Sequence, residues 1–149
     1  MAEFKQSVVI NRPVEDVFAF VSNLENDPPW TGAAEMRRTS QGPIGIGTTF
    51  SQQDRFLGRR LDLTLEVVGY EANHTIALRT TSGALSFGGT RILEPVGDTA
   101  TKVTFVGVGN AHGVQRLAEP LLAAMGGRRL RIQLGRLKQL MELPSSRRE

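Results

Sequence analysis

Few side chains in this sequence combine the chemical type and the position that catalysis or polar recognition inside a protein requires. Arg91 is the most notable of them, because it alternates in step with Phe87 and Leu93 and so shares their face of an expected strand. A guanidinium on an apolar face needs a carboxylate or a ligand acceptor close by. Arg91 is therefore a candidate for anchoring a ligand or for catalysis.

Gln52 and Asp54 are the partners that strand alternation offers to Arg91, because both share the parity of Phe50 on another expected strand. Asp54 is also a candidate proton acceptor. A bulge at Gly88-Gly89 would instead turn Arg91 outward. The residues do not decide between these two alternatives.

Three further residues have a polar group and a position that could suit a functional site. Each of them could instead have a purely structural role. Trp30 is the only tryptophan, and it either lines the rim of an interior or plugs it with its indole N–H satisfied. Tyr70, the only tyrosine, is a candidate general acid or a half-exposed residue near a strand end. His112 is a weak acid–base candidate, in the segment that precedes the last expected helix.

The composition argues against several reaction classes. There are no cysteines, and the two histidines lie far apart without a carboxylate at metal-ligand spacing, so we expect no metal site. No serine sits on a tight strand-to-helix elbow, and no glycine cluster follows the nucleotide-loop pattern. We therefore expect no cofactor.

Charge and hydropathy indicate an ordinary globular protein of 149 residues with a net charge of +3. No apolar run is long enough to span a bilayer, and the N-terminus does not have the pattern of a secretory signal, so we expect a cytoplasmic protein without stable membrane insertion. We expect no nucleic-acid partner, because aromatic residues are missing from the basic C-terminal region. That basic region reads as the solvated face of a helix or as a site for an anionic surface.

The N-terminal third predicts one strand and two short helices. Residues 4–10 are rich in β-forming residues, and Val14, Val17, Phe18 and Val21 then follow at helical spacing. Asn11 is the expected N-cap of that first helix. A second, brief helix is expected within residues 22–29, ended by its prolines.

Residues 33–108 predict six strands joined by short turns, and short turns favour antiparallel hairpins. The clearest strand is residues 61–67, where leucine and valine alternate with polar residues. Strand alternation also predicts a set of inward-facing apolar residues: Met36, Phe50, Leu61, Leu63, Leu65, Val67, Ile76, Leu78, Leu85, Phe87, Leu93, Val103 and Phe105.

Residues 114–143 predict one long helix, which completes a single expected domain over residues 1–143, with residues 144–149 as a flexible tail. Gly126-Gly127 interrupts the apolar stripe of this helix. Either the helix is straight and its small residues leave room for a ligand, or the glycine pair kinks it. Three apolar residues on another face, Leu121, Leu122 and Met125, would suit a partner or a dimer contact, so a monomer and a homodimer both remain open.

The order of these elements resembles the START-related (SRPBCC) superfamily, which includes bacterial polyketide cyclase/dehydrase-like proteins. The matching segments are NRPVEDVFAFVSNLENDPPW, GPIGIGTTF, RFLGRRLDLTLEVVGYE and RLKQLMEL. The resemblance implies an α+β helix-grip fold, in which a curved seven-stranded antiparallel sheet wraps around a long C-terminal helix, with two short helices between strands 1 and 2. It also implies a mostly apolar cavity between sheet and helix.

The predicted function is the binding or carriage of a small hydrophobic molecule, such as a lipid, an isoprenoid or an aromatic polyketide-like compound. A cyclase that closes rings by aldol addition and dehydration is an alternative, and a protein-interaction module is another. The residues expected to contact the ligand are Trp30, Met36, Phe50, Gln52, Leu63, Leu65, Leu78, Phe87, Arg91, Phe105, Gly126 and Leu130.

Overall fold

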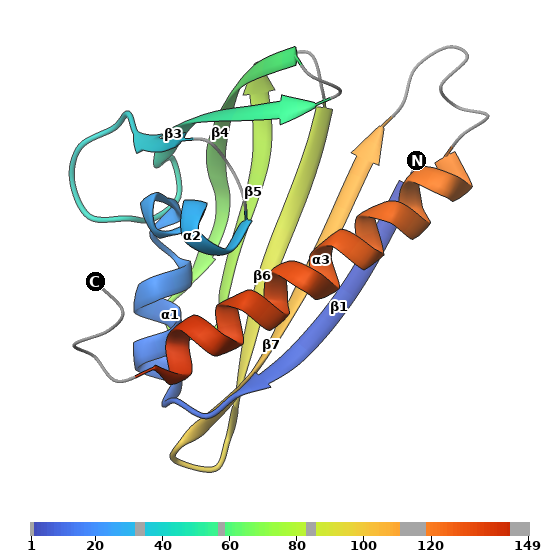
Figure 1. Ribbon diagram of the computed structural model, residues 1–149. Helices are drawn as coiled ribbons and strands as arrows, with labels where there is room; N and C mark the ends of the chain where they lie inside the picture. The colour runs from blue at the N-terminus through green and yellow to red at the C-terminus, as the bar shows by residue number, and fades with distance from the viewer. Residues whose placement is uncertain (1, 32–34, 57–58, 83–85, 111–118, 144–149) are drawn as a thin grey trace.

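The computed structural model describes residues 2–31, 35–56, 59–82, 86–110 and 119–143. Within them the chain forms a seven-stranded antiparallel sheet in the order β1-β7-β6-β5-β4-β3-β2, with helices on one side (Figure 1). This is the expected helix-grip arrangement. The strands are β1 (Ala2–Ile10), β2 (Glu35–Arg38), β3 (Thr49–Phe56), β4 (Arg59–Glu71), β5 (Thr75–Ser82), β6 (Ser86–Val96) and β7 (Ala100–Asn110).

Helix α1 (Val14–Val21) begins at a proline rather than at the predicted asparagine cap. Its N-cap is Pro13, whose carbonyl oxygen accepts from the backbone N–H groups of Asp16 and Val17. Asn11 lies too early in the chain to cap this helix. Its backbone N–H instead donates to Oε2 of Glu142 at 2.9 Å.

The second expected helix is two shorter pieces, and the prolines begin one of them instead of ending it. A single 3-10 turn, η1 (Leu24–Asn26), is followed by the one-turn helix α2 (Pro28–Thr31). Proline is favoured in the first turn of a helix because its φ is preset and no partner is needed there for the missing N–H. The break at Asp27 therefore redirects the chain from η1 into α2.

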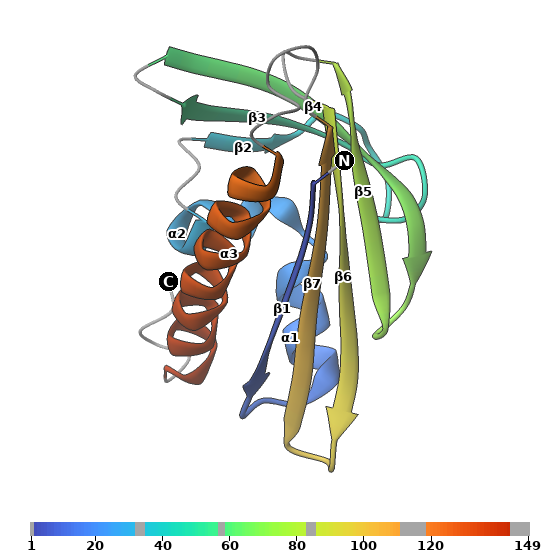
Figure 2. The same ribbon diagram turned by 90° about the vertical axis from the view of Figure 1, so that its right-hand side faces the viewer.

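The sheet is strongly curved, and Figure 2 shows β2 and β3 crossing over the end of the molecule at a steep angle to β1 and β7. Strand β4 is the longest strand, and its pairing with β5 shifts register between Thr64 and Leu65 and again between Val67 and Gly69. Such irregularities bend a strand and increase its twist. They allow the two halves of the sheet to face different parts of the interior.

Helix α3 (Glu119–Glu142) is continuous through Gly126-Gly127, and both ribbon views show it without a kink. It lies closest to β1 and α2. At Gly127 the position of a Cβ would be 3.8 Å from Cβ of Phe4 and 3.7 Å from Nε2 of Gln6. This glycine therefore brings α3 close to β1. Pro120 lies in the first described turn, where proline is tolerated.

The far end of α3 is fastened to the β1–α1 connection by Glu142. Its Oε2 accepts from Nζ of Lys138 at 2.6 Å, and Lys138 also donates to the carbonyl oxygen of Val9 at 2.7 Å. The hydrogen bonds from Lys138 and from the Asn11 N–H lower the pKa of the Glu142 carboxyl. This end of the helix is held by polar contacts as well as by its apolar face.

The buried apolar side chains of the described residues form two clusters. The first joins α1, α3 and the β1–β7–β6 half of the sheet, whereas the second lies on β2 to β5 under Leu24. Tyr70 is the one partly buried residue that packs against both. A domain of this size usually has one contiguous core. The described part of the interior is thus divided between the two halves of the sheet.

Candidate functional site

Arg91 points into the interior, and the alternative of a bulge at Gly88-Gly89 is not seen in the described part of β6. Arg91 pairs with Ile76 of β5 and with Phe105 of β7, and neither pairing shows a register shift along β6. The strand alternation that placed Arg91 beside Leu93 therefore persists in the fold.

Asp27 is the carboxylate that pairs with Arg91. Nη1 of Arg91 donates to Oδ1 of Asp27 at 3.0 Å and Nη2 donates to Oδ2 at 2.6 Å, which is a bidentate pair. Nη1 also donates to the carbonyl oxygen of Val21 at 2.8 Å. This acceptor lies at the C-terminal end of α1, where helix carbonyls need external donors. Asp27, and not the expected Gln52, is therefore the partner among the described side chains; the side chain of Asp54 lies outside them.

The ion pair between Asp27 and Arg91 is almost completely buried. The side chain of Asp27 is 3% exposed and that of Arg91 is 12% exposed. Burial raises the pKa of the Asp27 carboxyl, and the charge of Arg91 opposes this rise without cancelling it. The arrangement is therefore a neutralised ion pair, in which the guanidinium already has its anion.

Two aromatic rings hold the guanidinium of Arg91. Its central carbon lies 5.1 Å from the ring centroid of Trp30 and 4.9 Å from that of Phe105. The two rings are 5.5 Å apart and tilted against each other. Cation–π attraction is strongest where water is excluded, so the rings add to the fixed position of Arg91.

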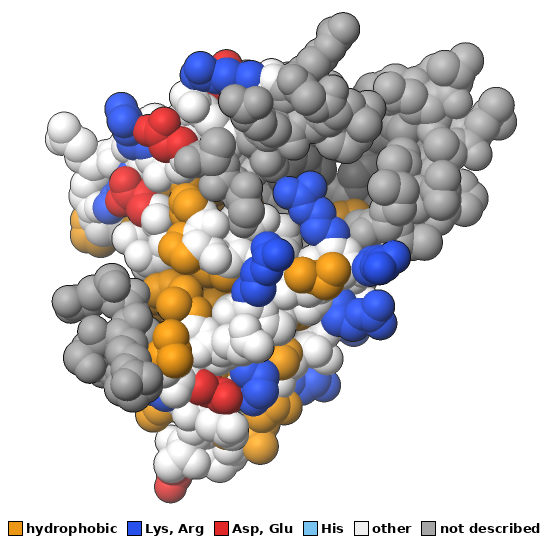
Figure 3. All heavy atoms as spheres, viewed as in Figure 1, with side chains coloured by type: hydrophobic (Ala, Val, Ile, Leu, Met, Phe, Trp, Pro, Cys, Tyr) orange, Lys and Arg blue, Asp and Glu red, His pale blue; other side chains and the backbone are white. Residues whose placement is uncertain are grey.

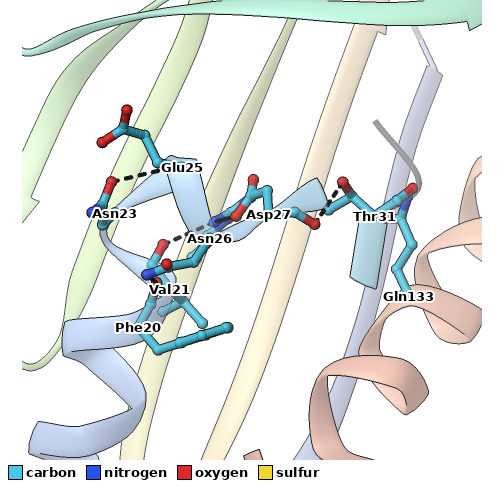
Figure 4. A network of polar contacts seen from close by, with 9 residues as sticks. Phe20, Val21, Asn23, Glu25, Asn26, Asp27, Thr31 and Gln133 are labelled. Carbon is cyan, nitrogen blue, oxygen red and sulfur yellow. Dashed lines mark hydrogen bonds and ion pairs between the residues drawn. The ribbon is translucent and has the colours of Figure 1, made fainter. Parts of the chain in front are cut away.

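The turn that carries Asp27 is itself held by a local network, drawn in Figure 4. Nδ2 of Asn26 donates to the carbonyl oxygen of Phe20 at 3.1 Å, and the hydroxyl of Thr31 donates to the carbonyl oxygen of Asp27 at 2.9 Å. Nε2 of Gln133 then donates to the carbonyl oxygen of Thr31 at 2.9 Å. The network connects α1, α2 and α3, and it fixes the carboxylate under the sheet.

Trp30 is buried, with 1% of its surface exposed, yet its indole N–H has no hydrogen-bond partner among the described residues. The ring is buried, as expected for a structural role, but the N–H group is not satisfied as that alternative assumed. A buried donor without a partner costs about 1–3 kcal/mol. An acceptor that enters the interior beside Trp30 would recover that energy.

Among the remaining polar candidates, the described side chains of Tyr70 and Gln52 make no hydrogen bond or ion pair with Arg91 or Asp27. Tyr70 is half-buried near the end of β4, and its ring meets Phe18 edge-to-face at 5.6 Å. Gln52 is partly buried on β3, Asp54 lies on the same strand with a side chain outside the described set, and His112 lies outside the described residues. His74 is in an exposed turn beside Thr75.

The apolar residues expected to contact a ligand are buried wherever their side chains are described, and several of them retain slight exposure. Six of them are 4–8% exposed, whereas Phe50 is 0% and Trp30 is 1% exposed. Phe87 and Gly126 have side-chain positions outside the described set. The slightly exposed residues are Met36, Leu63, Leu65, Leu78, Phe105 and Leu130.

Asp27 is the central residue that the sequence interpretation missed. Its signal was present, because an aspartate directly before two prolines ends one helical turn and begins another. Such a position is usually exposed, and strand alternation says nothing about a residue between helices.

The described residues contain no group of three potential metal-ligating side chains and no helix that is long and apolar enough to cross a membrane.

A curved antiparallel sheet that holds a C-terminal helix over a divided apolar interior defines a START-like helix-grip protein. The family model described as polyketide cyclase/dehydrase and lipid transport matches residues 1–142, and the chain belongs to this family. Comparison with curated protein sequences gave no significant match.

Solved structures share this fold at low sequence identity. A START superfamily protein from Mycobacterium smegmatis is 14% identical with a TM-score of 0.79, over 95% of this chain and 98% of that one. The protein TTHA0849 of Thermus thermophilus is 16% identical with a TM-score of 0.77, over 92% and 94%. The Zhui aromatase/cyclase of Streptomyces sp. R1128 is 13% identical with a TM-score of 0.76, over 94% and 93%.

Proposed function

We propose that this protein binds a small, mostly apolar molecule that carries at least one hydrogen-bond acceptor, and that the ligand lies between the two apolar clusters. The observation that carries the proposal is that the buried apolar side chains of the described residues fall into two clusters. An apolar ligand between them would complete a continuous core and remove the facing side chains from water.

The polar end of this ligand is assigned to Trp30. Its indole N–H is buried and has no partner in the described part of the chain, whereas Arg91 already donates to Asp27 and to Val21. A ketone, ester or hydroxyl oxygen suits a neutral donor. A free carboxylate would compete with Asp27 for Arg91 and would bring an uncompensated charge into the interior.

The test uses a matched pair of probes, the aromatic ketone 1-tetralone and its parent hydrocarbon tetralin. Binding to the folded state raises the melting temperature, and Trp30, the only tryptophan, reports on the site by its fluorescence. We expect both probes to bind and the ketone to bind more tightly. Trp30→Phe keeps an aromatic ring but removes the donor, so the preference for the ketone should fall by about fivefold.

Native mass spectrometry of protein purified without detergent provides an independent check, since a carried ligand would appear as added mass. If neither probe binds and no added mass is found in repeated preparations, the proposed function is wrong. If both probes bind but Trp30→Phe leaves the preference for the ketone unchanged, the interior site stands and the assignment of Trp30 fails.

A second candidate is a cyclase, favoured by the family description and by the similarity of fold to an aromatase/cyclase. Aldol closure and dehydration need a proton donor or acceptor inside the pocket. Arg91 is engaged by Asp27, so Tyr70 between the two clusters is the better candidate acid. Tyr70→Phe should lower kcat for a cyclisable poly-β-ketone at least 100-fold while leaving tetralone binding unchanged; unchanged turnover would remove Tyr70 from the reaction.

A further inference from the structure

The outward face of α3 carries a basic surface that the interior site does not use. Residues 127–141 include five cationic side chains and no acidic one. At 100° per residue Arg128, Arg129 and Arg136 fall on the side opposite the buried Leu130, Leu134 and Leu137, and Arg131 lies at the edge of that side. We call Arg128, Arg129, Arg131, Ile132 and Arg136 the arginine face.

Figure 3 shows Lys and Arg side chains gathered along this side of the molecule, with few acidic side chains near them. All four arginines are exposed. Lys138, the fifth cationic residue, is separate, because it pairs with Glu142 at 2.6 Å. The neighbouring helix α2 adds no charge, since its residues are Pro28, Pro29, Trp30 and Thr31.

The arginine face also contains an apolar side chain and a cleft. Ile132 is 48% exposed in the middle of the arginines, which is unusual for a large aliphatic residue on a solvated helix. A cleft of about 290 Å³ between α2 and α3 is lined by Thr31, Arg128, Arg129, Ile132, Gln133 and Arg136. The cleft has room for a phosphate group with cationic side chains on its walls.

We propose that the arginine face docks this protein on an anionic lipid bilayer. Arg128 and Arg136 are separated by about 12 Å along the helix axis, which spreads positive charge in a row that matches a plane of headgroup phosphates. Ile132 then enters the boundary between the headgroups and the acyl chains. Loss of one cationic side chain at an anionic surface weakens binding by roughly fivefold.

A bilayer fits this surface better than a nucleic acid or an acidic protein does. The arginine face has no aromatic side chain on which bases could stack, and it carries an exposed isoleucine that suits an acyl-chain boundary. A bilayer is also a natural reservoir for an apolar ligand, although the docking proposal does not depend on the identity of that ligand.

The experiment measures co-sedimentation of the ligand-free protein with vesicles. One set contains only phosphatidylcholine, and the other contains equal amounts of phosphatidylcholine and phosphatidylglycerol. We expect binding to the anionic vesicles alone, weakened by added salt because exposed charges are screened. The variant R128Q/R131Q/R136Q should bind on the order of 100-fold more weakly, and Ile132→Ser should bind several-fold more weakly.

The matched control is R37Q/R60Q/R79Q, which removes the same charge from exposed arginines on β2, β4 and β5. It should bind at least ten times more tightly than the α3 variant, since its losses lie outside the arginine face. Equal weakening by the two triple variants would show that only net charge matters and would overturn the proposal. Absence of binding to anionic vesicles would also overturn the proposal. This holds even if the arginine face were found to bind a nucleic acid or an acidic protein.

Tetralone binding of every variant is measured without vesicles. If the protein binds tetralone but does not bind anionic vesicles, only the docking proposal fails. If the wild-type protein binds anionic vesicles but does not bind tetralone, only the proposed function fails.

Discussion

Replacing Arg91 with methionine is expected to destabilise the folded protein by about 3–5 kcal/mol, because it leaves the carboxylate of Asp27 buried without its cation. Methionine keeps an aliphatic stem between Trp30 and Phe105, so most of the packing survives and the loss reports on charge. Chemical denaturation at neutral pH measures the change in the free energy of unfolding. A loss below about 1 kcal/mol would contradict the role assigned to the pair.

The double variant D27N/R91M is the control for this prediction. It removes both charges, so it should recover at least half of the stability lost in the single variant. Recovery would show that the pair is coupled and that the single variant suffers from an unpaired charge. A double variant as unstable as R91M would mean that Arg91 stabilises the protein by some other contact.

The pH dependence of R91M tests the same assignment with a defined sign. Burial already raises the pKa of Asp27, and loss of the guanidinium removes the charge that opposed this rise. A carboxyl whose pKa is raised by folding binds its proton more readily in the folded state. Its contribution is therefore favourable below the ordinary carboxyl pKa and is lost as the pH rises through the raised value. R91M should be closest to wild-type stability in acid.

This prediction also affects how an inactive Arg91 variant would be interpreted. Because Arg91 holds Asp27 and the end of α1, its loss disturbs the η1–α2 turn that carries Trp30. A loss of ligand binding in such a variant would not show that Arg91 contacts the ligand. Trp30→Phe and Tyr70→Phe are better probes of the site, since neither leaves a buried charge unpaired.

The second large effect is expected from truncating leucines at the two ends of the interior. Leu137 is 0% exposed within the cluster shared by α1 and α3, so Leu137→Ala should cost about 2–5 kcal/mol by leaving a cavity among well-packed neighbours. Leu63 is buried on β4 but belongs to neither cluster of described residues. Leu63→Ala should cost no more than about 2 kcal/mol.

Thermal or chemical denaturation of the ligand-free variants measures this difference. The contrast follows from the proposed unfilled space, because a side chain beside an existing void loses fewer contacts when it is shortened. Equal losses for the two variants would indicate a uniformly packed interior, and the argument for a ligand between the clusters would then fail. In the presence of tetralone the cost of Leu63→Ala should increase, since the ligand supplies the missing neighbour.

Local patterns were sufficient for most of the fold. Strand alternation and short turns identified the six strands after the helices, and the alternation of β4 placed Leu63, Leu65 and Val67 on the buried face. The prediction failed at the start of α1 and at the prolines of α2, where it assigned a cap to Asn11 and a stop to Pro28. At both places several residues fit the same local role, and packing against other elements selects among them.

The candidate site was predictable only in part. Strand alternation predicted that Arg91 shares the inward face of Phe87 and Leu93, because successive side chains of a regular strand point to opposite faces of the sheet. Its partner could not be found in this way. Asp27 is 64 residues away in the sequence and lies in a turn between two short helices, so neither period nor parity relates it to β6.

The sequence by itself determined the strands and the amphipathic helices, since these depend on neighbours a few residues apart. Only the tertiary structure decided that Arg91 points inward, that Asp27 is its carboxylate partner, that the indole N–H of Trp30 lacks a partner among the described residues, and which side of α3 faces outward. These properties depend on distances between segments far apart in the chain and on which side of α3 packs against β1 and α2.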